Sequence, residues 1–165
     1  MLYELLSQNL VRVNVKAADR EDAIRKVGAM MVENGFVEPS YVDGMCKVAV
    51  EMPGYIVITD GVAMPHARPE CGAKKVCAAL MALEKPVPFG NEAHDPVKLL
   101  IAIAAVDNSS HIDLIQNIAT IFDCEEVVEQ LKNSKTEQEI LKIIRENAGG
   151  NETTGSEENP DKTCS

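Results

Sequence analysis

The stretch from Val97 to Val106 is apolar at every position except Lys98. A strand with one face in water alternates apolar and polar residues, whereas a strand covered on both faces is apolar throughout. A similar run from Val76 to Leu83 predicts a second strand of this kind. Such strands need packing layers above and below them, so the sequence predicts an α/β fold with helices on both faces of a sheet.

The segments around these two runs carry the patterns of further strands and helices. Asn9 to Val15 alternates in the manner of a half-buried strand, and Tyr55 to Ile58 is rich in β-favouring residues before the turn signal Asp60-Gly61. Helical spacing of apolar residues and capping signals mark the segments 19–34, 41–52, 111–122, 124–133 and 136–147. We therefore expect a three-layer α/β sandwich with a mixed central β-sheet flanked by helices.

The chain has an excess of acidic residues, with 26 Asp and Glu against 16 Lys and Arg and a formal net charge of −10. This charge argues against nucleic acid or an anionic membrane as a partner. No apolar segment has the length of a membrane span, and the first residues lack the basic start of a secretory signal, so we expect a cytoplasmic protein without membrane insertion. Residues 1–148 are expected to form one domain, and residues 149–165, rich in Gly, Asn, Thr, Ser and Glu, a disordered tail.

The candidate nucleophile is His66, which follows Pro65 at the predicted end of a hairpin strand. Proline fixes its own φ and donates no hydrogen bond, so the imidazole is held on a stiff segment. Arg68 lies two residues further, on the same side of an extended chain. A neutral imidazole can attack phosphorus, while a guanidinium and backbone N–H groups near Ala67 can stabilise phosphoryl oxygens. These residues predict a phosphoryl-transfer site, although a single histidine at a strand end is more often structural.

The chain contains two other histidines. His111 is predicted to open a helix directly after the apolar strand, which places its ring near His66; the alternative is that it only caps its helix. His94 lies in a polar loop and is expected at the surface. No nucleotide-binding glycine motif, CxxC pair or clustered carboxylates occur, so we expect no cofactor and no metal, and another protein as the phosphoryl donor.

The sequence Gly61-Val62-Ala63-Met64-Pro65-His66-Ala67 resembles the active-site signature of the enzyme IIA (EIIA) domains of the mannitol/fructose type, which belong to the sugar phosphotransferase system (PTS). The resemblance covers about residues 3–147. Within this group, the PTS EIIA type-2 domains, the chain is most similar to the ascorbate type. The segments that carry this similarity are Pro53–Ile58, His66–Glu70, Pro88–Asn91, Asp95–Leu99 and Ala105–His111.

The resemblance implies a phosphotransferase that carries a phosphoryl group between proteins. It implies that His66 accepts the group from the phosphocarrier HPr, forms a phosphohistidine, and passes the group to a cysteine of enzyme IIB. The IIC permease would act downstream in the uptake of a sugar, with ascorbate as a candidate. His111 matches the second histidine that flanks the phosphorylated one in the family, and the layered α/β fold is also implied.

One departure from the family concerns the active-site cation. Mannitol-type members carry an arginine on the helix before the Pro-His segment, but residues 45–51 of this chain contain none. Either Lys47 or Arg68 is therefore expected to hold the phosphate.

Two alternatives differ in function. A nitrogen-regulatory type of EIIA shares a similar Pro-His-x-Arg segment and would act as a phosphorylation-dependent binding regulator; transfer of phosphate to an enzyme IIB cysteine distinguishes the two. A metal-dependent hydrolase would need two or three histidines that converge with carboxylates.

Overall fold

The computed structural model of the protein describes residues 2–148, so the predicted disordered tail at 149–165 lies outside the described residues. Its strands are β1 (Val11–Val15), β2 (Val57–Thr59), β3 (Val62–Ala63), β4 (Cys77–Val87) and β5 (Val97–Ala104). They form one sheet in the order β1-β4-β5-β3-β2. The pairs β1–β4 and β3–β5 are parallel, while β4–β5 and β2–β3 are antiparallel, so the sheet is mixed as predicted.

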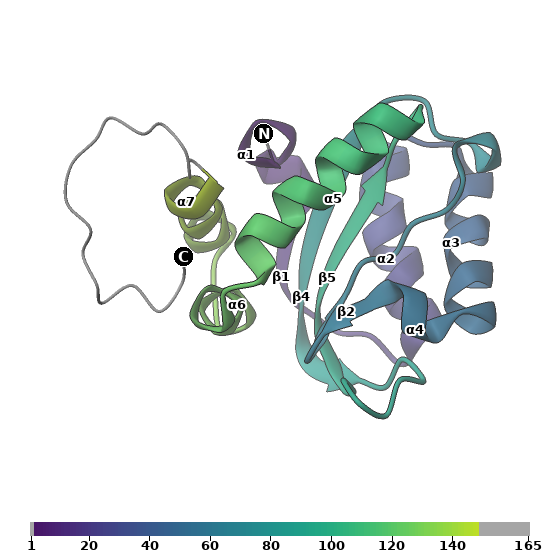
Figure 1. Cartoon of the computed structure of the whole chain (residues 1–165). Coiled ribbons are helices and arrows are strands. Elements are labelled where there is room, and N and C mark those ends of the chain that lie inside the picture. The colour runs from purple at the N-terminus through teal and green to yellow at the C-terminus, as the bar shows by residue number, and fades with distance from the viewer. Residues whose placement is uncertain (1, 149–165) are drawn as a thin grey trace.

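Helices cover both faces of this sheet (Figure 1). One side carries α2 (Arg20–Glu33) and α3 (Pro39–Glu51), and the other carries α5 (Asn108–Phe122), α6 (Glu125–Lys132) and α7 (Glu137–Ala148). Two shorter helices are α1 (Leu2–Leu5) and α4 (Pro53–Ile56). The arrangement confirms the predicted three-layer α/β sandwich. None of the described helices is both long and apolar enough to cross a bilayer.

The strands β4 and β5 lie at the centre of the hydrophobic core. Every residue of β5 except Lys98 is buried, and so are residues 77–83 of β4. Both strands contact α2 on one face and α6 on the other, which keeps both faces from water. This burial on two sides is the physical reason for the continuous apolar runs in the sequence.

The predicted strands differ from the observed ones at their ends. β1 begins at Val11, not Asn9, because Gln8–Leu10 form a 3-10 helix, and β5 ends at Ala104, not Val106. β4 continues past the predicted end at Leu83 to Val87, because a register shift in its pairing with β5 accommodates three exposed residues, 84–86. Tyr55 and Ile56, predicted as strand, belong to α4. Pro53 occupies the first turn of that helix, where its fixed φ is favourable. The hairpin therefore begins at Val57 and is shorter than its β-favouring residues predict.

Candidate active site

His66 lies at the edge of the sheet where the parallel strands β3 and β5 both end. Beyond β3 the chain continues beside β5, because the N–H of Ile103 donates to the Pro65 carbonyl at 3.0 Å. On the other side, the N–H of Met64 donates to the Ile56 carbonyl at 2.6 Å. The segment before His66 is therefore held both by β5 and by the end of α4.

The His66 ring is almost fully buried, with 7% of the residue exposed. Its Nδ1–H donates to the Met64 carbonyl at 2.8 Å. A carbonyl can only accept a hydrogen bond, so the proton of the neutral ring sits on Nδ1 and the lone pair on Nε2. Burial lowers the pKa of His66, the bond to Met64 opposes this change, and the nearby His111 adds to the lowering. The ring is therefore neutral near pH 7, with a nucleophilic Nε2.

We expect His66 to titrate below the ordinary imidazole value of 6.5, because burial destabilises the charged ring. The folded protein then binds this proton more weakly than the unfolded chain does. The contribution of His66 to the free energy of unfolding is therefore fully present above a pH of about 6.5 and decreases as the pH falls below it. An NMR titration of the ring would measure the midpoint, and a midpoint above the ordinary value would contradict this prediction.

His111 lies in the first turn of α5, which begins at Asn108. The carboxylate of Asp107 caps this helix by accepting the N–H of Ser110 at 2.8 Å, so the interpretation of His111 as the helix cap is wrong. The half-buried His111 ring lies beside that of His66, with centroids 5.9 Å apart and planes tilted by 45°. The exposed ring of Tyr55 also lies beside His66, at 5.1 Å between centroids. The structure thus brings the two predicted histidines together.

These rings line a cavity of about 390 Å³. Its lining residues are Val48, Met52, Tyr55, His66, Ala67, Arg68, Pro69, Asp107, Asn108 and His111. Arg68 is the only Lys or Arg in this lining, and it has no ion-pair partner among the residues that the structure describes. Its exposed guanidinium is thus available to an anion in the cavity. Hydrogen bonds from Ser110 keep the pKa of Asp107 low, so the cavity also has one fixed negative charge at its edge.

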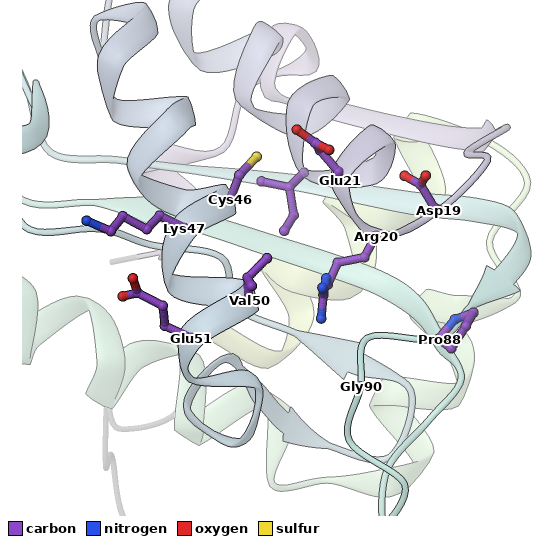
Figure 2. Close-up of a pocket in the computed structure, with 10 residues that line it drawn as sticks. Asp19, Arg20, Glu21, Cys46, Lys47, Val50, Glu51, Pro88 and Gly90 are labelled. Carbon is purple, nitrogen blue, oxygen red and sulfur yellow. The ribbon is translucent and has the colours of Figure 1, made fainter.

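A second, larger cavity of about 670 Å³ lies between α2, α3 and the loop after β4 (Figure 2). No histidine lines it. The guanidinium of Arg20 is already bound there, donating to the Phe89 carbonyl at 3.0 Å. Lys47 lines this cavity and does not line the one that contains His66. Of the two cations predicted to hold a phosphate, only Arg68 lies beside the histidines.

Two expectations about polar groups have different outcomes. The N–H of Ala67, expected to bind phosphoryl oxygens, instead donates to the hydroxyl of Tyr41 at 3.1 Å. Tyr41 lies on α3, far from Ala67 in the sequence, and was not among the predicted site residues. A tyrosine on the apolar face of a helix usually has a hydrogen-bond partner for its hydroxyl, and this rule could have marked Tyr41 as a candidate. His94, expected at the surface, is partly exposed and does not line the cavity, and its Nδ1 lies 2.6 Å from an oxygen of Asp60.

The other groups with possible chemistry do not form a site. Cys46 and Cys77 are buried free cysteines, and burial raises the pKa of Cys77 to about 12, so its thiol stays protonated. Within residues 2–148, no group of three or more His, Cys, Asp and Glu side chains is arranged to hold a metal ion.

Comparison with known sequences places the chain in a family. The family model of the phosphoenolpyruvate-dependent sugar phosphotransferase system, EIIA 2, matches residues 4–147. The ascorbate-specific PTS system EIIA component of Shigella flexneri is 38% identical over 145 residues, which cover 87% of this chain and 94% of that protein. The component of the same name from Escherichia coli (strain K12) is 37% identical with the same coverage.

Solved structures of related proteins have the same fold. The mannitol-specific cryptic phosphotransferase enzyme IIA from Escherichia coli is 33% identical, with a TM-score of 0.81 over 88% of this chain and 99% of that one. The mannitol enzyme IIA in its complex with phosphorylated enzyme IIB, also from Escherichia coli, is 30% identical, with a TM-score of 0.77 over 86% and 97%. The nitrogen regulatory protein IIA-Ntr from Neisseria meningitidis, at 20% identity and a TM-score of 0.73 over 86% and 97%, shares the fold alone, so it does not favour the regulatory alternative.

Both the sequence match and the fold agree with the family that the sequence resembles. The chain therefore belongs to the EIIA 2 family of the phosphoenolpyruvate-dependent sugar phosphotransferase system.

Proposed function

We propose that this protein is a cytoplasmic phosphocarrier that accepts a phosphoryl group on Nε2 of His66 from phosphorylated HPr and passes it to a cysteine of an enzyme IIB. The observation that carries the proposal is the state of His66: a buried neutral ring whose Nδ1–H is bound to Met64 and whose Nε2 has no partner among the described residues. The similarity to ascorbate-specific EIIA components supports ascorbate as the sugar that the whole system takes up.

The proposed reaction consists of two nucleophilic displacements at phosphorus. The Nε2 lone pair attacks the phosphorus, the bond from phosphorus to the donor nitrogen breaks, and the donor ring keeps that electron pair. A thiolate of enzyme IIB then attacks in the same way, and Nε2 recovers its lone pair. Because Nδ1–H stays bound to the Met64 carbonyl throughout, no proton has to move on His66.

The cavity provides groups that favour a phosphoryl group on His66. The guanidinium of Arg68 and the ring of His111 line it, and the first turn of α5 faces it at Asn108. The Asp107 carboxylate already accepts the Ser110 N–H in this turn, so the helix contributes mainly the positive partial charge of its N-terminus, which stabilises phosphate oxygens. Since the transferred group carries its negative charge on equatorial oxygens, these groups lower the barrier mainly through electrostatics and orientation.

The rim of the cavity has the character of a protein-docking surface. Tyr55 is 59% exposed and Met52 48%, and both line the cavity. Val106 and Ile112, 44% and 53% exposed, are sequence neighbours of the lining residues Asp107 and His111. Exposed apolar side chains grouped around a polar centre are typical of sites where another protein binds. This supports protein partners, HPr and enzyme IIB, as donor and acceptor.

We expect Arg68→Gln to slow phosphoryl transfer about tenfold, because one charge-assisted hydrogen bond at an exposed position is lost. Arg68→Lys should keep part of the rate, since the charge remains but the planar pair of donors does not. Lys47→Gln is the matched control, because Lys47 lines the other cavity. Initial rates of labelling from phosphorylated HPr measure all three, and a rate loss in Lys47→Gln with none in Arg68→Gln would contradict this assignment.

The proposed function is tested by relay labelling in vitro. Enzyme I, HPr and labelled phosphoenolpyruvate should transfer an acid-labile phosphate to the protein, and phosphopeptide mapping should find it on the peptide that contains His66. Addition of an ascorbate-type enzyme IIB should then remove the label from the protein and place it on the IIB cysteine, faster than a mannitol-type IIB does. A labelled protein that passes phosphate to neither IIB would contradict the carrier function.

A further inference from the structure

Tyr41 makes two hydrogen bonds through one buried hydroxyl. The residue lies on α3 and is 1% exposed. Its oxygen accepts the N–H of Ala67 at 3.1 Å, and its O–H donates to the carbonyl of Ile103 at 2.7 Å. The Ala67 carbonyl is a more distant acceptor at 3.3 Å, so the single hydroxyl proton is directed to Ile103. The hydroxyl therefore connects the residue after His66 to β5.

Ile103 also binds the residue before His66. Its N–H donates to the Pro65 carbonyl at 3.0 Å. Both chain neighbours of His66 are thus attached to one residue of β5, Pro65 directly and Ala67 through the hydroxyl of Tyr41. Because His66 lies between these two attachments, its backbone has little freedom to rotate. The bond from Nδ1–H to the Met64 carbonyl can then fix the ring.

We propose that Tyr41 is a positioning residue for phosphoryl transfer: by holding Ala67 against Ile103, its hydroxyl fixes the backbone on the C-terminal side of His66 and so aims Nε2 into the cavity. This inference rests on the proposed function of His66. Tyr41 does not line the cavity, so it acts through the backbone and not by contact with the phosphoryl group.

The position of Tyr41 suits this role over the whole physiological pH range. Burial raises the pKa of Tyr41 to about 12, so the hydroxyl stays protonated and can donate and accept at once. Close packing of α3 against the same segment supports the attachment: a Cβ on Gly44, also on α3, would lie 3.1 Å from the Cβ of Ala67. The helix therefore approaches the segment after His66 as closely as its side chains permit.

The test is Tyr41→Phe, which removes the hydroxyl and keeps the buried ring. We expect about a tenfold slower labelling by phosphorylated HPr, because the reacting nitrogen is no longer held in line. We also expect the ¹⁵N shifts of the His66 ring to move away from the pure Nδ1–H form, a change that a loss of stability alone would not cause. Ser134→Ala is the matched control, since it removes another buried hydroxyl, bound to the Gln130 carbonyl at the end of α6.

A folded Tyr41→Phe protein with the wild-type labelling rate and the wild-type His66 tautomer would overturn the inference. If Tyr41→Phe does not fold, Gly44→Ala is the second variant, because its added Cβ would lie 3.1 Å from the Cβ of Ala67 and 3.2 Å from the Cβ and Sγ of Cys71, while alanine favours the helix. An unchanged rate and tautomer in that variant, when its NMR spectrum shows that the Ala67 amide has moved, would overturn the inference too. If the wild-type protein itself takes no label on His66, the proposed function fails, and the tautomer measurement still decides on the role of Tyr41.

Discussion

The His66→Ala protein is expected to take up no measurable phosphate in the relay assay, a loss of about 10³-fold or more. Alanine offers no nucleophile, and no other group in the cavity combines a free ring nitrogen with a fixed tautomer. The neighbouring ring, His111, lies 5.9 Å away between centroids, on a different element, so it cannot occupy the same position without movement of α5. Acid-labile label on the purified protein after incubation with enzyme I, HPr and phosphoenolpyruvate measures the effect.

The matched control for this loss is His94→Ala. His94 is the histidine outside the cavity, bound to Asp60 at the hairpin turn, and its removal should leave labelling unchanged. Because His66 is buried, its replacement leaves a small void, so thermal unfolding must show that the variant is folded at the assay temperature. Label retained in folded His66→Ala, mapped to a peptide with His111, would make His111 the carrier and overturn the assignment.

The sheet could be predicted from the sequence because burial acts on both faces of its centre. The apolar runs of β4 and β5 follow directly from that burial. The Asp60-Gly61 turn was predictable because Gly61 adopts a φ of +71°, which other residues disfavour. The end of β4 was not predictable, since its exposed residues 84–86 have no apolar pattern and are held only by pairing with β5. Residues 55 and 56 are helical because Pro53 favours the first turn of a helix. The β-propensities of these two residues, taken alone, do not reveal that helix.

The ring at the centre of the proposed site could be singled out from the sequence, while the groups that support it could not. His66 stands out because Pro65 and the hairpin turn restrict its backbone, and these are local features. Whether Arg68 or Lys47 lies beside His66 depends on which cavity the Lys47 side of α3 lines, and tertiary packing decides this. The same holds for Tyr41, whose contact with Ala67 joins segments 26 residues apart. Local patterns therefore singled out the ring that we propose as the nucleophile, and only the packed structure identifies the groups that hold it.

His111→Ala is expected to slow phosphoryl transfer on the order of 10²-fold, the size of effect seen when a preorganised donor to a developing negative charge is removed. Its ring lies beside His66 at the start of α5, where an imidazole N–H can donate to a phosphoryl oxygen on Nε2. The fold should persist, because Asp107 caps the helix and alanine is a good helix former. Gln116→Ala, an exposed change on the same helix, is the matched control.

A second measurement separates a direct role of His111 from a structural one. The electrostatic interaction with His111 lowers the pKa of His66, so removal of the His111 ring should raise the His66 titration midpoint, which NMR measures without any partner protein. A slower transfer together with a raised midpoint means that the two rings interact as neighbours in one site. Transfer at the wild-type rate with an unchanged midpoint would show that His111 neither stabilises the transferred group nor shapes the electrostatics of His66, and the site would then depend on Arg68 and the α5 N-terminus alone.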